Sequence, residues 1–375
     1  MLLRPAAASF SDDEFDRRRT QTLQLAAGVD ASTVLAFGEN RSGLHVTYLS
    51  GWAPTRQAWL RLNSQGTDLW VSFHNHVPAA RRMAKADRVG DVADVEPRHL
   101  LGTDRVIGTL GQVPLHIRQA AEEAGATLIS LDRAHADLRS AKSDEEVDAL
   151  RLGGRASDIG ARALIEACRP GATDWDLLAE ARAAYTRAGA RDHICYIGVT
   201  DMDAPARDVP SQVPEGHVLT DRSVVTFELS AAVAPEYPGQ ILRTVFLGEP
   251  TDEYLTLHEV ASRAHERMRS RVKAGVAARE LVEAAGCVEE SGLTTTDDLF
   301  HGLGMGYLDP VGVSPSRRPY AEPRGDLRDG MSIVIQPNVT TIDHRAGVQT
   351  GQMIVVRPSG FEDLHNLEEG PVMAA

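Results

Sequence analysis

Short apolar runs separated by turn residues fill the first 140 residues of the chain. Runs of four to seven residues that end at Gly, Ser, Asn or Asp predict strands, and the stretch from His116 to Ala124 between two of them predicts a helix. Alternating strands and helices of this kind predict a small α/β domain over residues 1–140. The predicted strands are Thr33–Phe37, Gly43–Leu49, Ala58–Leu62, Leu69–Phe73, Arg105–Gly108 and Thr127–Leu131.

The period of the pattern becomes helical after residue 140. Ser143 and Glu146 have the spacing of a capping box, in which each satisfies a backbone N–H at the start of a helix. The helix is expected to run to Arg169-Pro170-Gly171, and Thr173 is expected to cap a second one. Strands are predicted at Ile194–Val199, Ser223–Leu229, Ser332–Ile335 and Met353–Val356.

An approximate internal repeat joins these elements. Arg169-Pro170-Gly171-Ala172 followed by Asp176-Leu177 returns as Lys273-Ala274-Gly275-Val276 followed by Glu280-Leu281. Each copy links a long helix to a shorter one, and strands follow each copy. The repeat predicts an α+β domain with pseudo-twofold symmetry over residues 141–375, with its site between the halves.

Composition then narrows the class of protein. The 375 residues carry 39 Lys plus Arg against 53 Asp plus Glu, a formal net charge of −14, so nucleic acid and anionic membranes are unfavourable partners. The three cysteines, Cys168, Cys195 and Cys287, are far apart and suggest neither disulfides nor a zinc site. No apolar run is long enough to span a membrane. A soluble, cytoplasmic protein is therefore expected.

Six segments together resemble the family of creatinases, aminopeptidase P and prolidases. The resemblance implies an α+β architecture, an N-terminal creatinase-type α/β domain followed by a C-terminal pita-bread domain that holds the active site, and usually a homodimer. The segments are Tyr48-Leu49-Ser50-Gly51-Trp52, Arg139 to Val147, Arg243-Thr244-Val245-Phe246-Leu247-Gly248, His301-Gly302-Leu303-Gly304-Met305, Leu327-Arg328-Asp329-Gly330-Met331 and Gly347 to Gly360.

The resemblance also implies a dinuclear metal site in the peptidase branch, built from two Asp, one His and two Glu. In register with the family, His301 keeps its place. The other four positions carry Leu229, beside Glu228, and then Gln240, Gln336 and Gly351. Glutamine is a neutral, weak ligand for divalent cations. No metal and no other cofactor is therefore expected, and a Xaa-Pro metallopeptidase is disfavoured.

Creatinase-like members of the family work without metal on small amidine-like compounds, using His and Glu as acid and base. By this resemblance His301 and Glu228 are the predicted catalytic pair, although alternation along its strand leaves open that Glu228 faces solvent. The family's proton-shuttling His is replaced by Gln212, with His193 and His217 nearby, and a second active-site His by Leu308. The segment from Phe227 to Val245 also resembles ectoine-hydrolase-like members.

Further residues are predicted to contact a small polar substrate. Gln212, Gln240 and Gln336 would form a neutral hydrogen-bonding pocket, because each amide offers a donor and an acceptor without charge. Additional substrate contacts are predicted at Tyr237, Arg243 and Asp309, and at Trp52 and Arg56 in a loop that would reach the partner's site in a dimer.

The first hypothesis for function is metal-independent hydrolysis of a C–N bond in a small nitrogen-containing metabolite. The alternatives are a biosynthetic lyase, isomerase or cyclase that uses the same pocket, and a non-catalytic pita-bread binding module.

Overall fold

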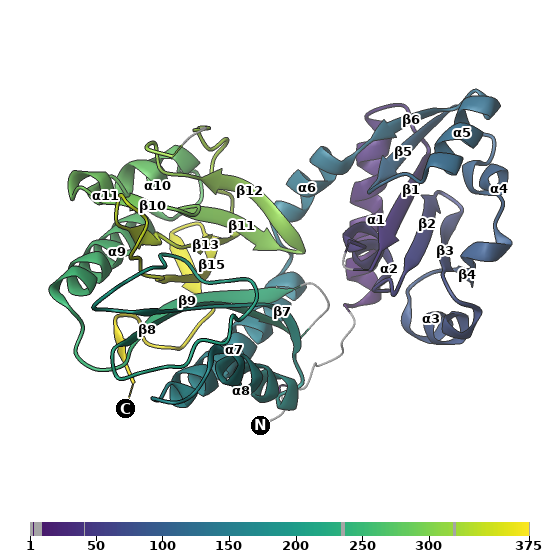
Figure 1. Cartoon of the computed structure of the whole chain (residues 1–375). Coiled ribbons are helices and arrows are strands. Elements are labelled where there is room, and N and C mark those ends of the chain that lie inside the picture. Colours follow the sequence, from purple (N-terminus) through teal and green to yellow (C-terminus); the bar gives the residue numbers. More distant parts are fainter. Residues whose placement is uncertain (1–2, 4–9, 41, 234–236, 318–319, 375) are drawn as a thin grey trace. The chain divides into compact units, whose positions relative to one another are not determined.

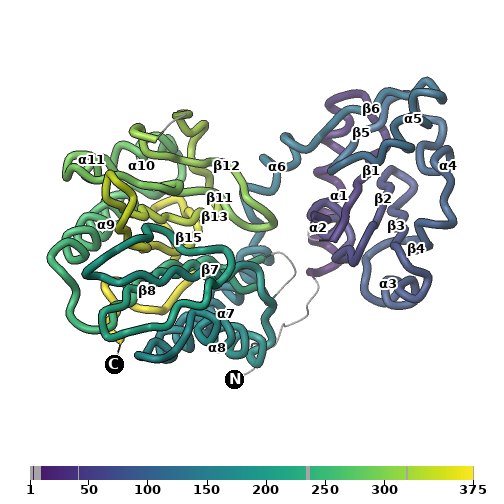
Figure 2. Tube along the Cα trace, in the orientation of Figure 1, coloured from purple at the N-terminus to yellow at the C-terminus, as the bar shows by residue number. Residues whose placement is uncertain are grey.

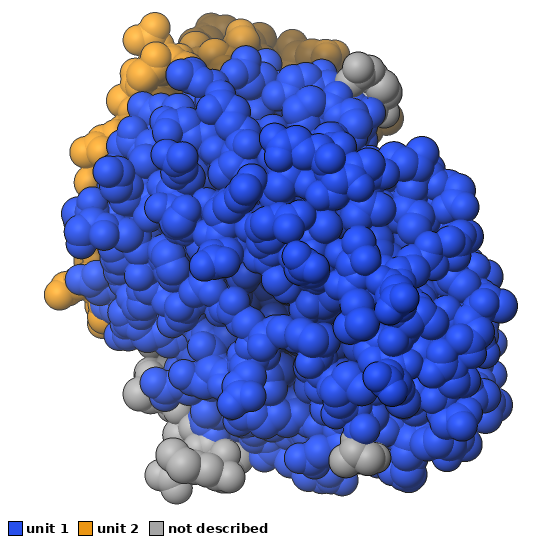
Figure 3. Space-filling view, turned by 90° about the vertical axis from the view of Figure 1, so that its left-hand side faces the viewer, with its two compact units in different colours: residues 1–6, 140–375 blue, residues 7–139 orange. Residues whose placement is uncertain are grey.

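The structure, a computed structural model, describes residues 3, 10–40, 42–233, 237–317 and 320–374. The chain divides into two compact units, one of residues 7–139 and one of residues 1–6 and 140–375 (Figure 3). The division falls one residue before the predicted boundary. The predicted first domain also included residues 1–6, which the structure groups with the larger unit. The backbone N–H of Leu3 donates to the carbonyl of Ala188 in that unit, 2.9 Å away.

The unit of residues 7–139 is built on a six-stranded sheet in the order β4-β3-β2-β1-β5-β6 (Figure 1). The strands β1, β5 and β6 are parallel, and β2 pairs antiparallel with both of its neighbours. Its strands are β1 (Thr33–Glu39), β2 (Gln57–Asn63), β3 (Gly66–Val71), β4 (Arg88–Asp91), β5 (Val106–Leu110) and β6 (Thr127–Ser130). Its helices are α1 (Asp12–Ala27), α2 (Leu44–Ser50), α3 (Val77–Met83), α4 (Pro97–Leu101), α5 (Leu115–Ala124) and α6 (Asp132–Ser140), with short 3-10 helices at His74–His76 and Val92–Asp94.

One predicted strand of this unit is wrong, because Gly43–Leu49 forms most of helix α2. Its side chains from Val46 to Ser50 are all buried, so the segment has the continuous apolar character of a buried strand. Gly43 and Gly51 bound the helix, and Gly51 ends it in the left-handed conformation at φ 74°. The remaining predicted strands match β1, β2, β3, β5 and β6.

The larger unit contains a nine-stranded sheet whose main path is β12-β11-β13-β15-β9-β8-β7. Two further strands attach to it, β16 to β15 and β17 to β9, while β10 and β14 form a separate pair. Its helices are α7 (Asp144–Ala167), α8 (Asp174–Arg187), α9 (Asp252–Arg271), α10 (Ala278–Ala284) and α11 (Cys287–Glu290). Its strands are β7 (Arg191–Asp201), β8 (Ser223–Ala232), β9 (Pro238–Phe246), β10 (Thr294–Thr295), β11 (Phe300–Gly304), β12 (Gly306–Gly312), β13 (Ser332–Ile335), β14 (Val339–Thr340), β15 (Gly351–Arg357), β16 (Gly360–Asp363) and β17 (Val372–Met373).

The predicted internal repeat is a structural one. Gly171 and Gly275 both stand at φ 88°, where a side chain would be strained. Each donates its backbone N–H over 2.8 Å to a leucine carbonyl, Gly171 to Leu219 and Gly275 to Leu327. Helices α7 and α8 pack on the half of the sheet around β8, and α9 and α10 on the half around β13 (Figures 1 and 2). This pseudo-twofold arrangement is the pita-bread fold expected from the sequence.

Helices α7, α8 and α10 pack on one face of the large sheet, and strand alternation decides which side chains face away from them. These helices leave the other face uncovered, although α9 packs there on Val224 and Phe246 at the ends of β8 and β9. On β8, Phe227 and Leu229 pack against the helices, so Glu228 lies on the opposite face. On β13, Ile333 and Ile335 pack against the helices, and Gln336 directly after the strand follows the same alternation to the open face. The uncovered face of the sheet therefore holds the polar groups.

The sequence analysis missed β9, although this strand links the two halves of the sheet. All nine of its residues are buried, and its polar members Gln240, Arg243 and Thr244 interrupt the apolar pattern that marks a strand. No helix among the described residues is both long and apolar enough to cross a membrane.

Candidate active site

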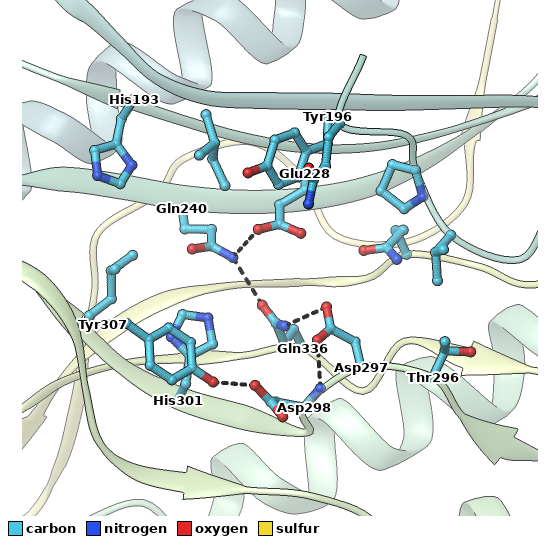
Figure 4. Close-up of a pocket in the computed structure, with 16 residues that line it drawn as sticks. His193, Tyr196, Glu228, Gln240, Thr296, Asp297, Asp298, His301, Tyr307 and Gln336 are labelled. Carbon is cyan, nitrogen blue, oxygen red and sulfur yellow. Dashed lines mark hydrogen bonds between the residues drawn. The ribbon is translucent and has the colours of Figure 1, made fainter. Parts of the chain in front are cut away.

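A cavity of about 490 Å³ opens on the uncovered face of the large sheet (Figure 4). It brings together side chains from both pseudo-symmetric halves, as the repeat predicted. Its lining residues are His193, Ile194, Tyr196, Val209, Pro210, Gln212, Glu228, Gln240, Thr296, Asp297, Asp298, His301, Leu303, Tyr307, Gln336 and Gln349.

A chain of hydrogen bonds through two amides joins two carboxyl groups across this cavity. Gln240 Nε2 donates to Glu228 Oε1 at 2.7 Å and to Gln336 Oε1 at 3.0 Å. Gln336 Nε2 in turn donates to Asp297 Oδ2 at 3.2 Å. The two glutamines are buried, with 3% and 2% of their surface exposed, so the chain is held in one arrangement.

Burial dominates the electrostatics of the cavity. It raises the pKa of Glu228 to about 8, and the nearby Asp297 carboxylate adds to this increase. Burial also raises the pKa of Asp297, although the backbone N–H of Asp298, which donates to this carboxylate, opposes the increase. Glu228 is therefore largely protonated at neutral pH. This is the state of a potential proton donor.

His301 is a buried imidazole fixed on both sides. Its Nδ1 donates to the carbonyl of Gly302 at 3.2 Å, so Nε2 is the acceptor of the neutral ring and points into the cavity (Figure 4). The ring of Tyr307 stacks on it with centroids 4.4 Å apart and planes 19° apart. The Tyr307 hydroxyl donates to Asp298, which also accepts from Arg317 at 3.0 Å. Burial lowers the pKa of His301, which favours the neutral ring of a general base.

A β-bulge in β12 explains why Asp309 does not enter the site although Tyr307, two residues before it, does. The register with β11 pairs Gly302 with Leu308 but His301 with Val311, so Asp309 and Pro310 are extra residues in β12. Leu303 and Tyr307 are direct partners across the two strands and lie on the face of His301. Asp309, predicted to contact substrate, is exposed and does not line the cavity.

Three further predicted residues belong to the larger unit, and only one of them, Gln212, lines the cavity. Gln212 is exposed but lines the cavity, as predicted. Tyr237 is buried and donates to Glu146 Oε1 at 2.5 Å, so it anchors the start of α7 and does not line the cavity. Arg243 follows the alternation of Ile241 and Val245 to the helix-covered face of β9, away from the cavity. The structure therefore places neither Tyr237 nor Arg243 in the cavity where their substrate contacts were predicted.

Trp52 and Arg56 belong to the unit of residues 7–139. Trp52 is buried and its carbonyl accepts from the Thr47 hydroxyl, while Arg56 is exposed with its guanidinium 5.9 Å from the Phe73 ring centroid. Their contact with a partner's site stays a prediction.

Several residues of the cavity were not predicted from the sequence. Asp297 and Asp298 lie four and three residues before His301, and two adjacent acids ahead of an apolar strand were a usable signal. The others, including Tyr196, Thr296, Tyr307 and Gln349, have no motif that distinguishes them from ordinary sheet residues.

The donor set does not fit a pair of divalent cations. Among the described residues, no three His, Cys, Asp or Glu side chains lie together so as to hold a metal ion. The Nε2 of Gln240 places N–H donors between the groups that would have to be ligands. Gly351 has no room for a carboxylate, since a Cβ there would come within 2.2 Å of the Ile335 carbonyl. Of the two neighbours at the first ligand position, Glu228 faces the cavity and Leu229 packs in the core.

Three comparisons with known proteins show which family this chain is similar to. The model of the metallopeptidase family M24 matches residues 148–358. The creatinase of a Bacillus species is 25% identical over 400 residues, covering 97% of this chain and 93% of that protein. The probable dipeptidase PepE of Mycobacterium tuberculosis is 26% identical over 364 residues, covering 92% and 93%. The crystal structure of the prolidase from Pyrococcus horikoshii superposes with a TM-score of 0.79 at 20% identity, covering 94% of this chain and 99% of that one. The chain therefore belongs to the metallopeptidase family M24.

Proposed function

We propose that this M24 hydrolase cleaves a C–N bond in a small, polar nitrogen compound of the amidine or amide type, without a metal ion. The observation that carries the proposal is the direction of the hydrogen bonds in the cavity. They use both N–H groups of Gln240 and one of the two on Gln336 Nε2, and they leave Gln240 Oε1 as an acceptor at the cavity wall.

Three groups in the cavity can accept hydrogen bonds from a ligand. Both hydrogens of Gln240 Nε2 are used, one on Glu228 and one on Gln336, so Gln240 Oε1 remains as an acceptor without a donor among the residues that the structure describes. His301 Nε2 is a second acceptor, and the carboxyl of Glu228 is a third group that accepts or, when protonated, donates. A ligand rich in N–H groups satisfies such a wall, and a carboxylate against it would be repelled.

The same groups can perform the addition of water. A water oxygen bonds to the substrate carbon and His301 Nε2 takes one of the water protons. Glu228, protonated below about pH 8, gives its proton to the double-bonded nitrogen or oxygen of the substrate. The C–N bond to the leaving group then breaks as the O–H proton of the adduct returns to Glu228, and the leaving nitrogen takes up a proton.

Peptide hydrolysis with metal is the second candidate, because several relatives are named as dipeptidases. It would require ions to bind where three of the family's carboxylates are replaced by Gln240, Gln336 and Gly351. A lyase, isomerase or cyclase on the same pocket is a third, and a binding module without turnover a fourth.

The experiment that tests the proposal is a screen of small amidines, guanidines, amides and Xaa-Pro dipeptides with the full chain, with and without added Mn²⁺, Co²⁺ or Zn²⁺. We expect turnover of an amidine or amide that metal does not stimulate, ¹⁸O from labelled water in the product, and loss of turnover in His301→Gln. Dipeptide cleavage that appears only with stoichiometric metal would refute it. A product without ¹⁸O would replace hydrolysis by the lyase or isomerase reading.

We also propose that the chain forms a homodimer whose small-molecule site is completed by the loop of Trp52 and Arg56, and that it works in the cytoplasm. Sedimentation of the wild type and of Arg56→Ala, together with the KM of the variant for the substrate found in the screen, would test the first part.

A further inference from the structure

His193 enters the cavity through an irregularity in β7. The register with β8 pairs Asp192 with Ala231 but Ile194 with Ser230, so β7 has one residue more than β8 at this point, and that extra residue is His193. Such a bulge interrupts the ladder at one residue and re-aims its side chain.

The neighbours of His193 show what the bulge does. Asp192 faces helix α8, where it accepts from the Tyr185 hydroxyl and from Arg182. Both His193 and Ile194 line the cavity, although adjacent residues of a regular strand face opposite sides. Counted back from Cys195 and Ile197, which pack against the helices, position 193 of a regular strand would also be on the helix side. The bulge reverses the alternation at this one residue and turns its imidazole into the cavity.

The place of His193 in the cavity complements that of His301. His193 comes from β7 at one edge of the sheet and His301 from β11, the strand next to the other edge, and Gln240 lies between them in Figure 4. His301 is 4% exposed, whereas His193 is exposed and lies where protons can be exchanged with solvent. The proposed addition step engages His301 and Glu228, and it does not assign the group that gives the departing nitrogen its proton.

We infer that His193 is a third acid–base group of this site, which protonates the leaving nitrogen as the C–N bond breaks. The inference rests on the proposed function. In the balanced step the imidazolium of His193 gives its proton to the leaving nitrogen, the electron pair of the C–N bond stays on that nitrogen, and a neutral amine departs. His193 then regains a proton from solvent, and His301 returns to solvent the proton it took from water.

The first test needs no turnover. Full-length protein labelled with ¹³C in its histidine rings is titrated with acetamidinium chloride, with signals assigned by His193→Gln, His301→Gln and His217→Gln. The signals of His193 and His301 are expected to move with the same half-saturation. His217, a surface residue 3.5 Å from Asp174 that does not line the cavity, is expected to stay unchanged. Movement of His301 without His193 would overturn the inference and leave the proposed function standing, whereas movement of neither would overturn both.

The second test uses the substrate found in the screen. His193→Ala is expected to lower kcat about 10²-fold, the lower range for loss of a positioned acid, and added imidazole is expected to restore at least about tenfold of it. The limb of the pH profile that His193 contributes should be absent in this variant, and His217→Ala should behave as wild type. Activity within about twofold of wild type in His193→Ala would overturn the inference. A loss that imidazole does not restore would also overturn it, because it would mean that the residue only shapes the strand.

Discussion

Replacement of Glu228 by glutamine should make the protein more resistant to unfolding at alkaline pH and leave it almost unchanged at acidic pH. Glutamine keeps the shape and can still accept from Gln240 Nε2, so the change removes mainly the ionisable proton. A carboxyl whose pKa is raised by folding binds its proton more tightly in the native than in the unfolded protein. Its contribution is fully present below the ordinary pKa of 4.5 and is lost as the pH rises through about 8.

The size of the effect follows from the pKa of Glu228. The difference between 4.5 and about 8 is about 3.5, and at about 1.4 kcal/mol for each it corresponds to about 5 kcal/mol. This is an upper value, because the native structure can relax around the charge. Urea unfolding of wild type and Glu228→Gln, followed by circular dichroism at about pH 5, 7 and 9, should show a free-energy difference that grows steadily in favour of the variant. The difference cancels the titration of groups that both proteins share.

A difference of unfolding free energies that does not vary with pH would refute this reasoning. It would mean that Glu228 is ionised in the native protein near its ordinary pKa, as a ligand of a bound cation would be. The same measurement therefore bears on the absence of metal in the proposed function.

Three further outcomes are expected. Arg243→Leu should lower the free energy of unfolding by about 3–5 kcal/mol in urea denaturation. The buried guanidinium donates to four carbonyls and to Gln352 Oε1, and all of these acceptors would lose a partner. A loss below about 1 kcal/mol would contradict this expectation. Tyr307→Leu should lower kcat/KM about tenfold or more. Tyr307→Phe should lower it less, because phenylalanine keeps the ring stacked on His301. Equal losses of the two variants in steady-state assays would assign the effect to the hydroxyl alone. The 7–139 unit should lose stability as the pH falls below 6.5. Burial lowers the pKa of His45 and His135, so the unfolded chain binds more protons than the folded one in this range. His135→Leu should therefore reduce the fall in Tm between about pH 7.5 and 5.5, and an unchanged fall would contradict this.

More of the fold than of the candidate site could be predicted from the sequence. Caps, glycines and apolar periods are local signals, so the helix begun by Ser143 and Glu146 and the paired glycines Gly171 and Gly275 were readable without coordinates. Strand β9 and helix α2 were not, because both are buried almost throughout and their patterns lack a polar side.

Within the site, the resemblance grouped Gln240 and Gln336 in one pocket, and their side chains do hydrogen-bond each other. Alternation along its strand left open that Glu228 faces solvent, and the packing of Phe227 and Leu229 against the helices is what assigns Glu228 to the cavity side. His193 reaches the cavity through a bulge and Asp309 is turned out of it by another, and a bulge depends on how two strands pair, which the residues of one strand do not determine. For the same reason Arg243, which shares its short motif with the family, could not be assigned to a face from the motif alone.

The two bulged strands are also the two ends of the large sheet, and this limits how copies of the chain can associate. A regular exposed edge is a template for further strands and so for aggregation. On β7 the ladder is broken at His193, and Ile197 and Ser211 exchange both of their backbone hydrogen bonds, so a loop of the same chain occupies that edge. On β12 the extra residues include Pro310, which has no N–H to offer. Extension of the large sheet from one molecule to the next is thus opposed at both ends, and a dimer that forms at this sheet must use side-chain surfaces.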